Sequence, residues 1–98
     1  MVLSGKQSRY LRTLAHPLQP IIQIGKGGIS DQVIDQIGLA LEARELIKIS
    51  VLNNSLLSVQ EAAEAVQVGT KAEIVQTIGR TVIAYRRSQD HRSIVLPR

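Results

Sequence analysis

At residues 21–30 the chain reads Ile21-Ile22-Gln23-Ile24-Gly25-Lys26-Gly27-Gly28-Ile29-Ser30. An apolar run is followed by a glycine-rich turn and then by a helical pattern, which predicts a strand at 21–24, a loop at 25–29 and a helix N-cap at Ser30. Glycines let another molecule approach the main chain closely, and a helix N-terminus behind them directs unpaired N–H groups to the same place. With the charge of Lys26 added, the stretch predicts a site for a phosphate backbone.

A turn without any ligand is the alternative interpretation, because glycine turns between strands and helices are common. Asp31, one residue beyond Ser30, also weighs against an anion site. Two nucleotide-binding motifs do not fit. The stretch lacks the Gly-Lys-Ser/Thr sequence of a Walker loop, and the third glycine of a Gly-x-Gly-x-x-Gly motif would fall on Ser30.

Periodic patterns on both sides of this stretch predict the remaining elements. The expected helices cover residues 4–16, residues 30 to about 44, and a segment that starts at the Ser58-Val59-Gln60-Glu61 capping box and stops at Gly69. The expected strands cover residues 21–24, 46–52, 72–78 and 81–86, the last two joined by a type II′ turn at Gly79-Arg80. The order α-β-α-β-α-β-β predicts an α/β fold, a small mixed sheet with packed helices in which the first two strands are parallel and the last two antiparallel.

The chain has 98 residues, which is enough for one small domain. We expect that domain to cover residues 1–87, and residues 88–98 to form a flexible or lightly docked C-terminal tail. The absence of cysteine excludes disulfides and cysteine-based zinc sites, and it fits a reducing cytoplasm. No apolar run approaches the roughly 20 residues that span a bilayer, so no contact with a membrane is expected.

The net charge of +4 is concentrated near the N-terminus. Lys6, Arg9, Arg12 and Lys26 precede the first acidic residue, Asp31, and from that residue onward eight basic residues balance eight acidic ones. The first three cations fall on the polar face of the first expected helix, which carries no carboxylate. A one-sided positive field favours a polyanionic partner. A mitochondrial transit peptide is the alternative for an acid-poor N-terminus, although the prolines and the apolar run that follow are more typical of folded structure.

No pattern in the sequence favours an enzyme. His16 and His91 lie far apart, no metal-ligand spacing occurs, and we expect no catalytic residue, metal or cofactor. Glu42 and Glu45 close the second expected helix and are interpreted as solvated helix-end charges. Aromatic stacking is expected to be minor, because the chain has no Phe or Trp and Tyr10 lies on the apolar face of the first helix, which is typical of core packing.

Short blocks with a specific order and spacing cover about residues 3–87. They are Leu3-Ser4-Gly5-Lys6-Gln7, Tyr10-Leu11-Arg12, Ala15-His16, Leu18-Gln19-Pro20, Gly25-Lys26-Gly27-Gly28, the run 40–48, Gly79-Arg80-Thr81 and Tyr85-Arg86. Together they resemble the CRM domain, as found in bacterial stand-alone YhbY-type proteins. One departure is Leu56-Leu57, which is apolar where members of that family are more polar.

The resemblance implies a compact fold similar to the C-terminal domain of bacterial translation initiation factor three. It implies RNA binding by a Gly-x-x-Gly loop like that of KH domains, which falls on Gly25, Lys26, Gly27 and Gly28. The implied partner is RNA rather than DNA, in precursors of the large ribosomal subunit. Lys6, Arg9 and Arg12 would extend the contact if the first helix lies beside the loop. A protein-interaction adaptor on the ribosome, without direct RNA contact, is the alternative.

Overall fold

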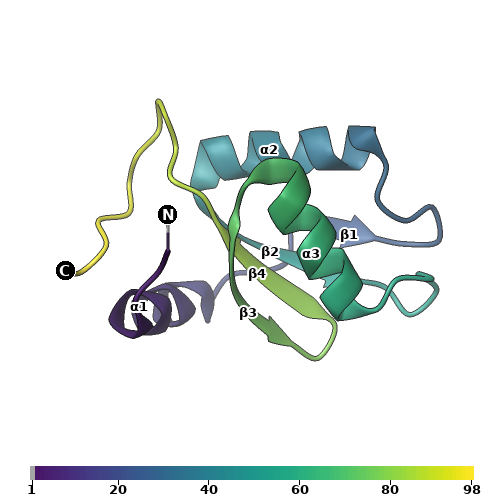
Figure 1. Ribbon diagram of the computed structural model, residues 1–98, viewed down its shortest axis with the longest axis horizontal. Helices are drawn as coiled ribbons and strands as arrows, with labels where there is room; N and C mark the ends of the chain where they lie inside the picture. Colours follow the sequence, from purple (N-terminus) through teal and green to yellow (C-terminus); the bar gives the residue numbers. More distant parts are fainter. Residues whose placement is uncertain (1) are drawn as a thin grey trace.

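The computed structural model describes residues 2–98, and Figure 1 shows them as one sheet with helices on both sides. The elements follow the expected order, α-β-α-β-α-β-β. The helices are α1 (Gly5–Ala15), α2 (Asp31–Arg44) and α3 (Val59–Thr70). The strands are β1 (Ile22–Ile24), β2 (Leu46–Val51), β3 (Glu73–Ile78) and β4 (Thr81–Tyr85).

A serine side chain starts each of these helices. The hydroxyl of Ser30 accepts a hydrogen bond from the N–H of Val33, which confirms the N-cap expected there. The capping box at Ser58 is also confirmed, and Ser4 forms a second one with Gln7. Each cap satisfies backbone N–H groups that the first turn of a helix leaves unpaired, so the three starting points are determined locally.

The prediction that Gly69 stops α3 is wrong. The helix continues through Thr70, and Lys71 adopts the left-handed conformation that ends it, with a φ of 62°. Gly69 serves a different purpose, because α2 packs directly against it. A Cβ atom at this position would lie 2.6 Å from Cδ1 of Ile34, a distance that real Cβ atoms do not tolerate. The missing side chain therefore allows α2 and α3 to approach closely.

The sheet has the strand order β1-β2-β4-β3. As expected, β1 pairs in parallel with β2, and β3 pairs antiparallel with β4. In the turn between the last two strands, φ is positive at Gly79, at 55°, and is not positive at Arg80. A type II′ turn requires this pattern at its two central residues. The central pair, β2 with β4, is antiparallel and places Lys48 opposite Ile83.

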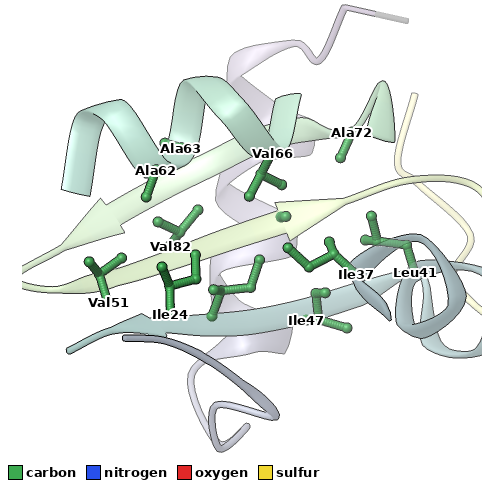
Figure 2. Packing of buried hydrophobic residues seen from close by; sticks show 12 residues of the cluster. Ile24, Ile37, Leu41, Ile47, Val51, Ala62, Ala63, Val66, Ala72 and Val82 are labelled. Carbon is green, nitrogen blue, oxygen red and sulfur yellow. The ribbon is translucent and has the colours of Figure 1, made fainter. Parts of the chain in front are cut away.

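Alternating residues of the strands supply two separate cores. One core lies between the sheet and the pair α2 and α3, and Figure 2 shows how its side chains interlock. It consists of Ile24, Ile37, Leu41, Ile47, Ile49, Val51, Ala62, Ala63, Val66, Ala72, Val82 and Ala84. The other core lies under α1 and consists of Leu11, Ala15, Leu46, Val75, Ile83 and Tyr85. Tyr10 belongs to neither core: it is 39% exposed, so the expectation that it packs inside is wrong.

Residues 88–98 form no helix or strand but lie along the domain, as the yellow segment of Figure 1 shows. Ile94 and Leu96 pack against the core under α1. Two side chains of α1 donate to the last carbonyls, Gln7 to Pro97 and Lys6 to Arg98, both at 3.1 Å. The segment is also held from the other side of the molecule, by two carboxylates at the end of α2.

Glu45 is wholly buried, and its carboxylate binds this segment. One oxygen accepts from the N–H of Ser93 at 2.7 Å and of Ile94 at 2.9 Å, and the other accepts from the N–H of Ser88 at 2.9 Å. Burial acts to raise the pKa of Glu45, but these N–H donors outweigh it and hold the pKa below its ordinary value. Glu45 also has a φ of 67°, so backbone strain at the helix end accompanies this network.

Glu42, one turn earlier, binds the same segment. Its carboxylate accepts from the N–H groups of Gln89 and Asp90 and from the hydroxyl of Ser88 at 2.6 Å. The Gln89 N–H contributes most to lowering the pKa of Glu42, to about 2, with the Ser88 hydroxyl next. The interpretation of Glu42 and Glu45 as solvated helix-end charges is therefore wrong: together they form a carboxylate latch for the C-terminal segment.

Replacing the buried carboxylate should destabilise the whole protein. Glu45→Gln keeps the size of the side chain but exchanges one accepting oxygen for an NH₂ group that faces backbone N–H donors. We expect the free energy of unfolding to fall by about 2 kcal/mol, as for lost hydrogen bonds to a charged group. Chemical denaturation measures this, with Glu64→Gln on the exposed face of α3 as the control. Equal stability of the two variants would contradict the role given to Glu45.

The latch should also weaken in acid. The pKa of Glu42 is about 2 in the folded protein and 4.5 without these contacts. The folded state therefore disfavours protonation, and the carboxylate stabilises it fully above about pH 4.5, with the effect lost as the pH falls toward 2. We expect the melting temperatures of wild type and Glu42→Gln to differ most above pH 4.5 and to converge toward pH 2. A gap that stays constant over this range would show that Glu42 does not titrate with folding.

Candidate functional site

The glycine loop forms a tight, projecting turn. The N–H of Gly28 donates to the carbonyl of Gly25 at 3.0 Å, which leaves Lys26 and Gly27 exposed at the tip. Gly28 has a φ of 69°, a conformation that side chains with a Cβ rarely adopt. A Cβ built on Gly27 would meet no atom within 4 Å. The tip is therefore open to a ligand that approaches at backbone distance.

Several other segments meet the loop at one end of the molecule. The carbonyl of Ile24 accepts from the N–H of Leu52, and Gly25 lies against the side chains of Leu52 and Asn54. The loop 52–58 is thus its neighbour, and Figure 1 shows both loops together with the N-termini of α2 and α3. Helix N-termini attract anions, although acidic first-turn residues, Asp31 and Glu61, offset part of that effect.

Arg80 adds a cation to this end of the molecule. Its guanidinium donates from Nε to the carbonyl of Val51 at 2.7 Å and from Nη2 to that of Leu52 at 2.8 Å. These bonds tie the β3–β4 turn to the segment that borders the glycine loop. The sequence analysis placed Arg80 in the turn and in a family block but gave it no part in the site. The signal that it missed is the arginine itself, a charged residue in a two-residue hairpin loop.

The structure separates Lys26 from the cations of α1. Figure 1 shows α1 toward one end of the long axis and the glycine loop at the other. Lys6 is exposed and engaged with the carbonyl of Arg98, while Arg9 and Arg12 line an open groove beside the sheet. The predicted site residues thus form two groups: the loop 25–28, and a set of cations on α1.

The described residues, 2–98, contain no group of three or more His, Asp or Glu side chains placed to hold a metal ion. Among the same residues, no helix combines the length and apolar character needed to cross a membrane. The glycine loop itself offers backbone groups, glycines and the cation of Lys26, a composition that suits binding of a polyanion.

Known proteins are similar to this one in sequence and in fold. A relative from Bacillus subtilis, named Probable RNA-binding protein YqeI, is 51% identical over 96 residues, which cover 98% of this chain and 100% of that protein. An RNA-binding protein from Haemophilus influenzae is 40% identical over 98% of this chain and 96% of its own length. The solution structure of the hypothetical protein SAV1595 from Staphylococcus aureus superposes with a TM-score of 0.80 at 50% identity, covering 98% of this chain and all of that one.

A family model matches the region that holds the blocks noted in the sequence. The model of the CRS1 / YhbY (CRM) domain matches residues 3–86, which include α1, the glycine loop and all four strands. Because the match covers nearly the whole chain and the relatives are similar from end to end, this protein belongs to the CRS1 / YhbY (CRM) domain family.

Proposed function

We propose that this protein binds RNA by gripping the sugar-phosphate backbone with the loop 25–28. The observation that carries the proposal is the exposed Lys26-Gly27 tip on a turn that Gly25 and Gly28 close. The names of two relatives, which describe them as RNA-binding proteins, point the same way. The supporting geometry is a main chain that a phosphate can approach without meeting a side chain.

The chemistry of the grip follows from the residue types at the tip. Lys26 would neutralise a phosphate, and the bare backbone beside it would allow the sugar and phosphate to come within contact distance. Such a grip recognises the backbone and shape of RNA rather than its base sequence. We assign Lys6, Arg9 and Arg12 to a second group of phosphate contacts, reached by a different part of the same RNA.

We further propose that the bound RNA is ribosomal RNA in precursors of the large ribosomal subunit, and that the protein acts in the cytoplasm. It is supported by the resemblance to stand-alone YhbY-type proteins. A role as a ribosomal adaptor that contacts protein is the second candidate, and Leu56 is the observation that favours it, since this apolar side chain beside the glycine loop is 92% exposed. Nuclease treatment separates the two, because an adaptor would stay bound to protein partners after RNA is digested.

Binding should depend strongly on salt. Each phosphate neutralised by Lys or Arg releases counterions, so log K should fall linearly with log salt concentration. With Lys26 and the cations of α1 in contact, we expect a slope that corresponds to roughly two to five phosphate contacts. Titration of a fluorescently labelled RNA at increasing salt measures the slope. A slope near zero would exclude a backbone-led mechanism.

Charge reversal in the loop should abolish most of the binding. We expect Lys26→Asp combined with Gly27→Asp to lower RNA affinity at least tenfold, because carboxylates at the tip repel phosphates and fill the space that the backbone must enter. Gly25 and Gly28 remain to close the turn, and the space around Gly27 accommodates a side chain. The fold should therefore persist.

The matched control changes the charge equally at the far end of α3. Gln67→Glu combined with Lys71→Asp also lowers the net charge by three units, at exposed positions, and aspartate tolerates the left-handed conformation of Lys71. This control should bind RNA within about threefold of wild type after the loss of net charge is allowed for. Melting temperatures of both variants are measured beside affinity. Equal binding by the two variants would refute the role of the loop.

A further inference from the structure

The face of the sheet that carries α1 is only partly covered. α1 and the C-terminal segment cover the core of Leu46, Val75 and Tyr85, whereas the part of this face nearer the β3–β4 turn stays open. The opening is a groove of about 740 Å³ between α1 and the sheet. It is lined by Arg9, Arg12, Thr13, His16, Pro17, Lys48, Gln76, Ile78 and Ile83. The lining residues thus include three permanent cations and no carboxylate.

The strand register arranges three of these side chains in a row. Lys48 on β2 pairs with Ile83 on β4, and Ile83 pairs with Gln76 on β3. Paired residues project from the same face, and neighbouring strands lie about 4.8 Å apart. Ile83 itself is buried, so the row offers a ligand the cation of Lys48 and the amide of Gln76, one on each side of it. Ile78, which is 55% exposed, supplies the apolar part of the floor.

We propose that this groove is a second RNA site, which holds a single-stranded segment of the RNA that the glycine loop binds. The base lies over Ile78, the amide of Gln76 hydrogen-bonds to its edge, and Arg9, Arg12 and Lys48 bind the flanking phosphates. A base can reach this floor only when it is unpaired, so the site selects single strands. The inference rests on the proposed function, and it adds that the RNA is single-stranded where it enters the groove.

Charge and composition together favour this occupant. Several cations without a carboxylate select a polyanion, and an apolar floor with one amide suits the faces and edges of nucleobases. Because the floor has no aromatic side chain, stacking is weak and the phosphate contacts dominate, with little preference among bases. Ile78 in the groove also directly precedes the β3–β4 turn, whose Arg80 binds the carbonyls of Val51 and Leu52 beside Gly25.

An isosteric substitution tests the floor of the groove. Gln76→Glu places a carboxylate among the cations without a change of size. Gln67→Glu makes the same exchange at an exposed position on α3, across the sheet. With a single-stranded RNA of about 12 nucleotides, we expect Gln76→Glu to weaken binding about fivefold and Gln67→Glu to bind within about twofold of wild type.

Photocrosslinking locates the base itself. RNA that contains 4-thiouridine is irradiated in complex with the wild-type protein and digested with trypsin, which releases residues 72–80 and 81–86 as separate peptides. We expect crosslinks in the peptide 72–80, which carries Gln76 and Ile78, and their loss in a fully double-stranded version of the RNA. The peptide 27–44 reports on the glycine loop in the same experiment.

The outcomes separate this inference from the proposed function. If the loop variant loses affinity while Gln76→Glu and Gln67→Glu bind alike and no crosslink reaches 72–86, the groove is not an RNA site, and a protein segment is the better candidate for it. If duplex RNA crosslinks to 72–86 as well as single strands do, the selection of single strands is wrong. If wild type binds no RNA, the proposed function falls together with the inference.

Discussion

The antiparallel pairing of β2 with β4 connects every part of this molecule. Its register sends Ile47 and Ile49 toward α2 and α3, and Lys48 and Ile83 toward α1. Backbone hydrogen bonds continue the pairing beyond both ends of the ladder. At one end the N–H of Arg86 donates to the carbonyl of Glu45, which brings the following residues to the latch. At the other end the N–H of Val51 donates to the carbonyl of Arg80, beside the glycine loop. A shift of this register would therefore disturb the core, the latch and the candidate site together.

Much of the fold could be predicted because its elements depend on local patterns. The caps at Ser30 and Ser58 act over three residues, and the alternation in β2 is complete within six. The glycine turn at 25–28 closes through one hydrogen bond between its own ends. Such features appear in a short window of sequence, whatever the rest of the chain does. The family blocks added RNA as the expected partner of the loop.

The features that sequence reasoning missed depend on contacts between distant segments. The donors to Glu45 lie 43, 48 and 49 residues away and are backbone N–H groups, which leave no trace in residue identity. A carboxylate at a helix end therefore resembles an ordinary solvated charge. Gly69 resembled a helix stop because its partner, Ile34, lies on another helix. The groove required the register of three strands before Lys48 and Gln76 could be placed on one face.

The two left-handed residues, Glu45 and Lys71, have a consequence for protein engineering. Both occupy backbone conformations that favour glycine, and a stabilisation protocol that reads only dihedral angles would replace both. Lys71 is exposed, so glycine there relieves strain and removes little else. At Glu45 the same relief would delete the acceptor for three backbone N–H groups. The hydrogen bonds of the Glu45 carboxylate stabilise the fold by more than the backbone strain at that residue costs. Consensus rules for helix ends, which favour glycine, would therefore choose the wrong residue there.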